Sequence, residues 1–198
     1  MKKIKKGTFI GIDVGAYKKG FHGIVLKNKK IISIYHSISV EEICCWCDDF
    51  SPDVIAIDAP CGWSKDRLSR EAERNLIIKG KRIPCFSTPT KKISHTKKYY
   101  EWILNGEKLY EELRLNRFNP IETYPYGIIR CLLDNYSFPK LELRKKILKK
   151  YNISSEKLKV IDEYDATLCA INACYHFYNQ TKAFGNQEEG YIILPVIY

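Results

Sequence analysis

Apolar positions along the chain follow two spacings, one typical of buried strands and one typical of amphipathic helices. Residues 7–14, 21–26 and 31–35 are short apolar runs separated by turn residues, and they predict a three-stranded meander. Residues 43–50 then carry apolar side chains at the i, i+3, i+4 and i+7 spacing, after a capping box that begins at Ser39. The start of the chain is therefore predicted to be three strands followed by a helix.

The rest of the chain predicts one more strong strand, several helices and two weaker strands. Residues 53–58 form a continuous apolar run, typical of a strand that is covered on both faces. Residues 121–124 predict a short strand and residues 191–196 an edge strand, since Pro195 cannot donate to a central ladder. Residues 81–95 contain two prolines and predict a loop. Helices are predicted over residues 64–79, 96–115, 126–134, 139–150 and 160–178.

This order of elements predicts an α/β protein. No internal repeat, low-complexity tract or flexible linker divides the 198 residues, so we expect one domain over residues 1–198, with an insertion at about residues 61–118. That insertion, called the 61–118 segment below, is about twice as long as a simple helical crossover requires.

The two most apolar strands each reach an aspartate near the carboxyl end. Asp13 follows Gly11-Ile12, and Asp58 follows Ala56-Ile57. If a helix crosses over between these strands, they are parallel and their carboxylates meet at the carboxyl edge of the sheet, where open α/β sheets bind ligands. An isolated buried carboxylate loses solvation worth several kcal/mol, so each aspartate must be neutral, paired or metal-bound. The alternative is that each caps the turn that follows it.

Three further acids are candidates for the same place. Glu122 ends a third strand, Asp165 lies in the apolar stripe of the last helix, and Asp162 precedes Asp165 by three residues on the same side. Converging carboxylates repel one another, and Mg²⁺ or Mn²⁺ reverses that penalty. Two such ions about 3.5 to 4 Å apart can drive hydrolysis of a phosphodiester. The alternatives are a salt bridge for Glu122 and a helix-start role for Asp162.

Positive charge is concentrated in one part of the chain. The formal net charge is +10, and between residues 75 and 100 there are seven Lys and Arg but no acid. Phosphate is the natural partner for such a surplus, although a general bias toward lysine explains it equally simply. The basic residues Lys91, Lys92, Lys97 and Lys98 flank aromatic residues, a pattern of single-strand binding, but Trp102 also belongs to a helical apolar stripe and is expected in the core.

Six motifs in order resemble the family of predicted RNase H-like nucleases, in the Holliday-junction-resolvase branch of the RNase H-like superfamily. They are Gly11-Ile-Asp-Val-Gly15, Ile57-Asp-Ala-Pro60, Arg70-Glu-Ala-Glu-Arg74, Glu122-Thr-Tyr-Pro-Tyr-Gly127, Asp162-Glu-Tyr-Asp-Ala166 and the stretch from Glu188 to Pro195. The resemblance implies a three-layer RNase H-like fold with a mixed five-stranded sheet and a C-terminal edge strand.

The resemblance also implies a function. Asp13, Asp58 and Asp165 would hold two Mg²⁺ or Mn²⁺ ions, with Asp162 or Glu122 as further members of the set. Arg67, Arg70 and Arg74 would face the cleft and contact substrate, although their pattern also fits a solvated helix face. The expected activity is that of a metal-dependent nuclease acting on DNA or RNA. The alternatives are a non-catalytic nucleic-acid-binding module and a hydrolase of a small phosphorylated metabolite.

Cysteine content and targeting signals bear on the cellular compartment in which we expect the protein. There are eight cysteines but no export signal, so we expect reduced thiols in a cytoplasmic protein. Residues 44–47 contain a C-x-x-C, but no second ligand pair follows at zinc-finger spacing, which favours ordinary burial over a zinc site. No apolar stretch is long enough to span a membrane.

Overall fold

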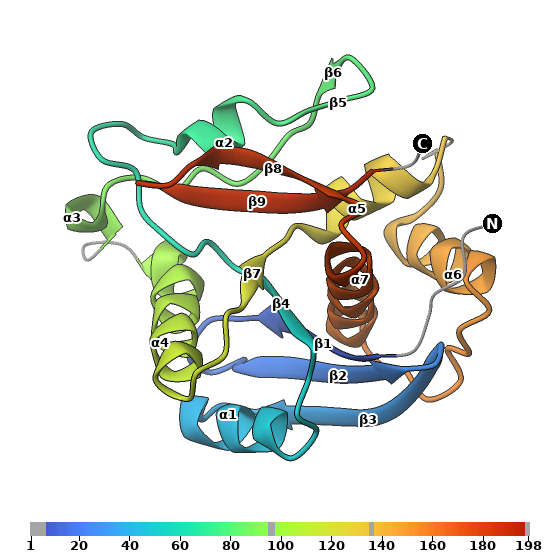
Figure 1. Ribbon diagram of the computed structural model, residues 1–198. Helices are drawn as coiled ribbons and strands as arrows, with labels where there is room; N and C mark the ends of the chain where they lie inside the picture. Colours follow the sequence, from blue (N-terminus) through green and yellow to red (C-terminus); the bar gives the residue numbers. More distant parts are fainter. Residues whose placement is uncertain (1–6, 95–97, 135–136, 197–198) are drawn as a thin grey trace.

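The computed structural model describes residues 7–94, 98–134 and 137–196. Its centre is a mixed sheet of seven strands in the order β3-β2-β1-β4-β7-β9-β8 (Figure 1). The strands are β1 (Thr8–Val14), β2 (Phe21–Lys27), β3 (Lys30–Ser37), β4 (Val54–Asp58), β7 (Ile121–Glu122), β8 (Thr181–Asn186) and β9 (Gly190–Pro195). A separate two-stranded sheet is formed by β5 (Ile77–Ile78) and β6 (Lys81–Arg82).

Seven α-helices and one 3₁₀ helix are found in the described part of the chain. They are α1 (Val40–Asp48), α2 (Glu71–Arg74), α3 (Lys91–Ser94), α4 (Glu101–Leu115), α5 (Pro125–Leu132), α6 (Lys140–Lys150), α7 (Ile161–Phe177) and the 3₁₀ helix η1 (Lys98–Tyr100). Within these described residues, no helix has both the length and the apolar character that crossing a bilayer demands.

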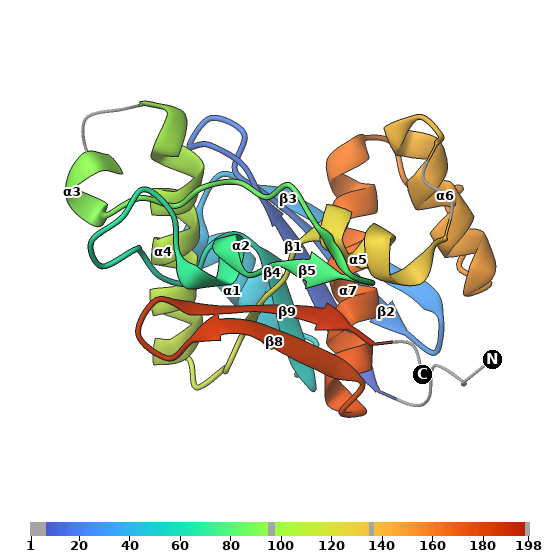
Figure 2. The ribbon, with the colours of Figure 1, turned by 90° about the horizontal axis from the view of Figure 1, so that it is seen from above.

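Helices cover both faces of the sheet, because buried side chains of β1 and β4 alternate between two cores. Ile10 and Ile12 of β1 pack with α1 and α4, while Phe9 packs with Ala56 of β4 and with α7. Figure 2 shows α4 and α7 on opposite sides of the central strands. The α/β class and the layered arrangement are as predicted, although the sheet has seven strands rather than five.

One glycine allows α7 to lie directly on β1. A Cβ atom at Gly11 would be 1.9 Å from the carbonyl oxygen of Ala166 and 2.3 Å from the backbone nitrogen of Ala170. Because no side chain fits there, the helix backbone packs against the strand backbone. This contact places the first turns of α7 beside the carboxyl end of β1, where Asp13 is found.

The C-terminal strand is not at the edge of the sheet, so that prediction was wrong. β9 lies between β7, to which it is parallel, and β8, to which it is antiparallel. The sequence reading missed β8, which forms the actual edge. Pro195 is tolerated because it is the last residue of β9, opposite Thr181 at the start of β8.

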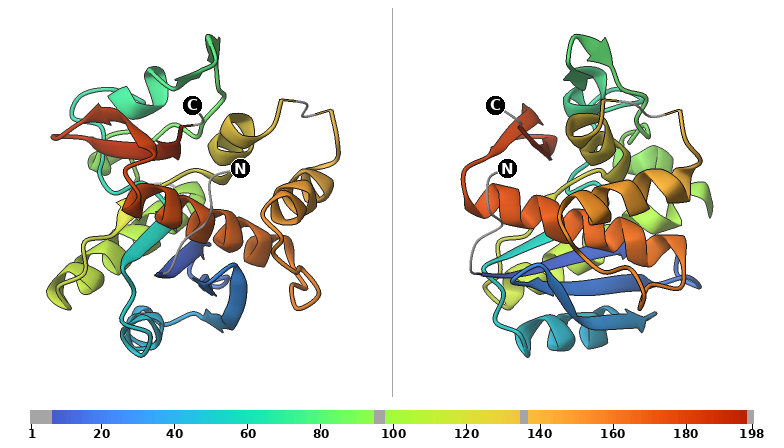
Figure 3. Two further views of the ribbon diagram at one scale, coloured as in Figure 1. Left: turned by 45° about the vertical axis from the view of Figure 1, so that its right-hand side comes forward. Right: turned by 90° about the vertical axis from the view of Figure 1, so that its right-hand side faces the viewer.

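The 61–118 segment departs most from the predicted helices. The helix predicted over residues 64–79 is reduced to the single turn of α2, because Arg70 adopts an extended conformation (φ −71°, ψ 161°) and turns into the interior. The predicted loop over residues 81–95 also contains β6 and α3. Figure 3 shows α2 against the β8–β9 hairpin, where Asn186 donates a hydrogen bond of 2.7 Å to Glu71.

Candidate active site at the carboxyl ends of the central strands

Asp13 and Asp58 are direct neighbours on adjacent parallel strands. The register of β1 and β4 pairs the two residues, and strands in a sheet lie about 4.8 Å apart. Because side chains alternate between the two faces along a strand, Asp13 lies on the same face as Phe9 and Asp58 on the same face as Ala56. This is the face of the sheet that α7 covers. The two carboxyl groups are close enough for each to shift the pKa of the other. The predicted meeting of these two acids is therefore what the structure contains.

Burial makes ionisation of this pair unfavourable. Asp13 is 8% exposed, and burial, together with the charges of Asp165 and Asp162, raises the pKa of its carboxyl group to about 7. Burial also raises the pKa of Asp58 well above its ordinary value, and the charges of Asp13 and Asp165 add to that effect. Because burial and neighbouring negative charge raise both pKa values, this pair keeps protons to a higher pH than isolated aspartates do.

Asp165 and Asp162 reach the same region from the first turns of α7, but each has a basic partner. Asp165 accepts hydrogen bonds of 2.7 Å from Nε and 2.8 Å from Nη2 of Arg144, which lies on α6. Burial raises the pKa of the Asp165 carboxyl, while the Arg144 guanidinium opposes that rise. Asp162 accepts a hydrogen bond of 2.8 Å from the Lys19 ammonium, and its second oxygen lies 3.6 Å from Nε2 of His22.

The four aspartates thus differ in how their charge is balanced. Asp13 and Asp58 are neighbours whose pKa values are raised by burial, whereas Asp165 and Asp162 are paired with Arg144 and Lys19. Over residues 7–94, 98–134 and 137–196, no group of three or more His, Cys, Asp or Glu side chains is arranged to hold a metal ion. Asp13 and Asp58 by themselves offer the hard oxygen ligands that Mg²⁺ and Mn²⁺ take, and Asp165 joins them only if it leaves Arg144.

The sequence reasoning missed both basic partners. Arg144 lies between Leu143 and Ile147, two buried residues of α6, so an arginine inside the apolar stripe of that helix was the available signal. Lys19 lies in the turn between β1 and β2, close to the end of the strand that carries Asp13. Only the docking of α6 and of this turn against α7 brings the two cations to the aspartates.

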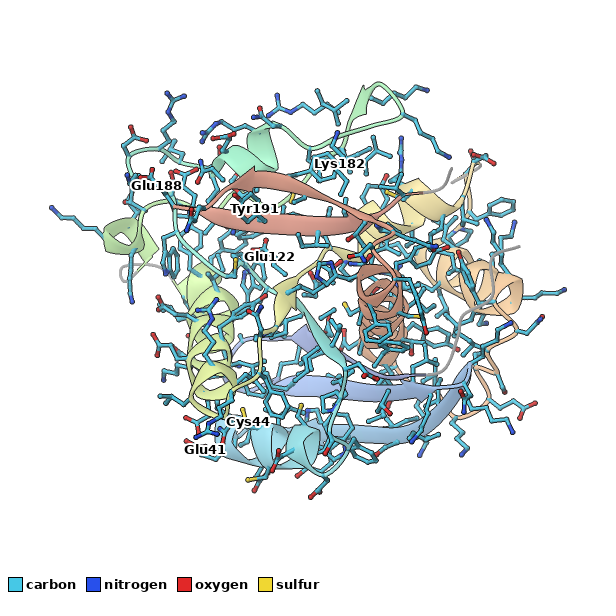
Figure 4. The ribbon with its side chains drawn as sticks, viewed as in Figure 1. Glu41, Cys44, Glu122, Lys182, Glu188 and Tyr191 are labelled. Atoms are coloured by element: carbon cyan, nitrogen blue, oxygen red, sulfur yellow. The ribbon has the colours of Figure 1, made fainter. Side chains whose placement is uncertain are left out.

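Glu122 is not brought into this cluster. The register pairs it with Ile57, so its side chain points to the opposite face of the sheet from Asp58. Its carboxylate accepts hydrogen bonds of 2.5 and 2.8 Å from the Arg70 guanidinium and one of 2.8 Å from the Cys61 backbone N–H. Figure 4 shows Glu122 in the interior, below β9. Both Glu122 and Arg70 therefore belong to a buried ion pair.

The basic residues proposed to bind substrate have different positions. Arg70 is 1% exposed and holds Glu73 as well as Glu122, so it is not accessible to a substrate, contrary to the prediction. Arg74 is partly buried and donates to the Ser69 carbonyl. Lys97 lies outside the described residues. The accessible basic residues of this set are Arg67, Lys91 (2.8 Å from Glu107), Lys92 and Lys98.

The C-x-x-C of residues 44–47 is divided between the core and the surface. The Cys44 and Cys47 side chains are buried in the core that α1 shares with α4, while Cys45 is exposed. Burial raises the pKa of the Cys44 thiol to about 12, which keeps it protonated at neutral pH. These thiols therefore act as small apolar residues.

Comparison with known proteins gives a family and a fold. A family model described as "Protein of unknown function (DUF429)" matches residues 11–189. No curated protein matches the chain. Among solved structures, the chain is similar to Thermus thermophilus RuvC in complex with a Holliday junction substrate, with a TM-score of 0.51 and 13% sequence identity over 87% of this chain and 94% of that chain. A second structure of Thermus thermophilus RuvC gives a TM-score of 0.51 and 12% identity over the same shares. The RNase H-like fold expected from the motifs is confirmed.

Proposed function

Because the chain belongs to the DUF429 family and has the fold of RuvC, we propose that it is a metal-dependent nuclease of the RNase H-like superfamily. The reaction centre is the Asp13–Asp58 pair, with Asp165 and Asp162 beside it. The partner is nucleic acid, as it is for the RuvC structure that contains a Holliday junction substrate.

The observation that carries this proposal is the pairing of Asp13 with Asp58 on adjacent parallel strands, where burial raises the pKa of both carboxyl groups. Ionisation of both groups is unfavourable unless a positive charge lies beside them, and the carboxyl ends of parallel strands are where open α/β sheets bind ligands. Asp13 and Asp58 are the residues that would hold Mg²⁺ or Mn²⁺. A bound ion of this kind polarises a phosphoryl oxygen and lowers the pKa of bound water.

Other side chains of the site have roles in binding and orientation. The Lys19 ammonium is half-exposed. Partial burial lowers its pKa, but the hydrogen bond to Asp162 and the charge of Asp13 outweigh that effect, so the pKa is raised overall and the group stays protonated. We assign Lys19 to a non-bridging phosphate oxygen. Arg144 holds Asp165 in place through two hydrogen bonds. In a two-ion mechanism, Asp165 would hold the second ion only after its carboxylate had released Arg144. Arg67, Lys92 and Lys98 are assigned to the phosphate backbone further from the centre.

A cleavage assay tests the assignment. Labelled single-stranded, duplex and four-way-junction oligonucleotides are incubated with the protein and Mg²⁺ or Mn²⁺. We expect Asp13→Asn and Asp58→Asn to reduce cleavage by at least about a hundredfold, beyond the roughly 10- to 100-fold cost of losing an outer-shell partner. Asp48→Asn is the matched control, because Asp48 is exposed on α1. Full activity in the Asp13→Asn protein would refute the proposal.

One observation favours a second function, that of a non-catalytic nucleic-acid-binding module. Arg144 and Lys19 already balance two of the four aspartates, so a cation is not required at Asp165 or Asp162. A binding module predicts salt-sensitive binding that is unchanged by chelator and by Asp13→Asn, with no cleavage in any metal. Measuring binding of Mn²⁺ to the wild-type and Asp13→Asn proteins by calorimetry separates the two functions, since only the nuclease needs Asp13 to hold an ion.

A further inference from the structure

A cleft of about 370 Å³ opens directly beside the proposed reaction centre. Asp58 lines it, and the 61–118 segment contributes Phe86 and Trp102 to the same lining. Tyr124, just after β7, lines it as well. The volume is near the lower end of the range of roughly 300 to 1,000 Å³ that small-molecule sites occupy. The cleft is therefore a compartment that the 61–118 segment adds to the carboxyl edge of the sheet.

The walls of this cleft are aromatic and fixed in place. The Phe86 ring packs edge-on against Trp102, with centroids 4.8 Å apart and planes at 87°, and the Tyr99 ring centroid lies 5.1 Å from that of Phe86. The Tyr124 hydroxyl donates a hydrogen bond of 3.0 Å to the Pro84 carbonyl, which ties the 61–118 segment to the end of β7. Preorganised rings of this kind lose little conformational freedom when a planar group binds against them.

Trp102 differs from the other two tryptophans. The Trp46 indole N–H donates to Ser33 at 3.1 Å, and that of Trp63 donates to Glu107 at 2.9 Å. The Trp102 indole N–H has no acceptor within the part of the chain that the structure describes. It is half-buried at the cleft, so it presents both a π face and an unused donor there.

The charge of the cleft excludes a phosphate group from its interior. Glu73 and Glu122 line it and are 5% exposed, while the single cation between them, Arg70, directs its donors to these two carboxylates and to the Glu189 carbonyl. Two carboxylates and one guanidinium leave a net negative charge. A neutral planar ring is tolerated in such a place, whereas a phosphate is repelled.

From the aromatic residues and net negative charge of its lining and from its position beside Asp58, we propose that this cleft binds the base of an unpaired nucleotide next to the bond that is cut. This inference rests on the proposed function and specifies its substrate class. A base inside a stacked duplex cannot enter a recessed pocket without leaving its partner. The substrate is therefore nucleic acid that presents an unpaired nucleotide at the cleavage site, such as a single strand, a loop or a strand exchange point.

Binding without cleavage tests this inference. Full-length protein in chelator is titrated with a single-stranded oligonucleotide that carries 2-aminopurine, and separately with the same strand paired to its complement. We expect tighter binding of the single strand, with 2-aminopurine quenched. Replacing Trp102 by leucine keeps an apolar side chain but removes the π face, and should weaken single-strand binding roughly 5- to 150-fold, as losing a base–aromatic stack does. Duplex binding should be unchanged.

The controls separate stacking from folding. Trp102→Phe should restore single-strand binding, and Trp63→Phe, in the same segment but outside the cleft, should have no effect. If Trp102→Leu does not show a cooperative melt, Phe86→Leu takes its place in the same titration. Equal binding of single strand and duplex, or wild-type single-strand binding by a folded Trp102→Leu protein, would overturn the inference.

The outcomes for this inference and for the nuclease are distinguishable. Metal-dependent cleavage that is indifferent to pairing, abolished by Asp13→Asn and unaffected by Trp102→Leu, would retain the nuclease and reject the cleft as a base site. Selective single-strand binding that depends on Trp102, with no cleavage in Mg²⁺ or Mn²⁺, would retain the base site and reject the nuclease.

Discussion

Replacing Asp13 by asparagine should stabilise the protein at alkaline pH while abolishing its function. In the folded chain the pKa of Asp13 is raised from 3.8 to about 7, mainly by burial. Because the raised value favours the protonated form, the contribution of this group to stability is fully present below about pH 3.8 and is lost as the pH rises to about 7. The amide of asparagine has the same shape and does not ionise, so the variant escapes this loss.

The size of the effect follows from the difference in pKa. Each pKa unit corresponds to about 1.4 kcal/mol, so a rise from 3.8 to about 7 makes the ionised folded state about 4 kcal/mol less stable than it would otherwise be. Roughly 3 kcal/mol of this loss develops between about pH 5 and about pH 8. This is a large fraction of the 5 to 15 kcal/mol by which domains are typically stable.

Urea unfolding in chelator at about pH 5 and about pH 8 measures this effect. The measured quantity is the difference in unfolding free energy between Asp13→Asn and wild type. The pKa values of His22 and His176 are lowered by burial, and because both histidines titrate in both proteins, their contributions to stability cancel in this difference. We expect that difference to grow in favour of the variant by about 3 kcal/mol between the two pH values. Saturating Mn²⁺ should remove it by stabilising only the wild type.

Two results would refute this reasoning. A difference in free energy that does not change with pH would mean that Asp13 ionises normally in the folded chain. A variant that Mn²⁺ stabilises as much as it stabilises wild type would mean that Asp13 does not hold the cation. Asp48→Asn, exposed on α1, should show neither effect.

Three further changes test the surroundings of the site. Arg144→Gln removes the partner of Asp165 and should cost about 3 kcal/mol without metal, and the rise in Tm on adding Mn²⁺ should exceed that of wild type in thermal melts. Glu122→Gln weakens the buried pair with Arg70 and should lower the urea midpoint while leaving Mn²⁺ binding by calorimetry intact. Gly11→Ala inserts a methyl group 1.9 Å from the Ala166 carbonyl, so it should abolish the cooperative melt or lower the unfolding free energy by at least about 3 kcal/mol.

Features set by local periodicity could be predicted from the sequence. The apolar runs gave the three-stranded meander and the strand ending at Asp58, and the 3.6-residue spacing gave α1, α4 and α7 to within about five residues of their ends. The position of Asp13 and Asp58 at one edge followed as well, because neighbouring parallel strands end together. In each case the information lies in residues close together along the chain.

The helix predicted over residues 64–79 shows where local pattern was overridden. Its residues have acceptable helix propensity, yet Arg70 is drawn inward by Glu73 and Glu122 and takes an extended conformation at the start of α2. A buried guanidinium without carboxylate partners is so costly that satisfying it outweighs the few tenths of a kcal/mol per residue that helix propensity supplies.

The sequence by itself therefore determined the layers of this protein and the two aspartates at its centre. Only the tertiary structure decided which charges meet: the register of β7 with β4 turned Glu122 to the opposite face, and the docking of α6 brought Arg144 to Asp165. The physical reason is the separation along the chain of the residues that interact. Side-chain periodicity is a property of a few consecutive residues, whereas ion pairs form between residues that the sequence separates widely and only packing brings within about 3 Å.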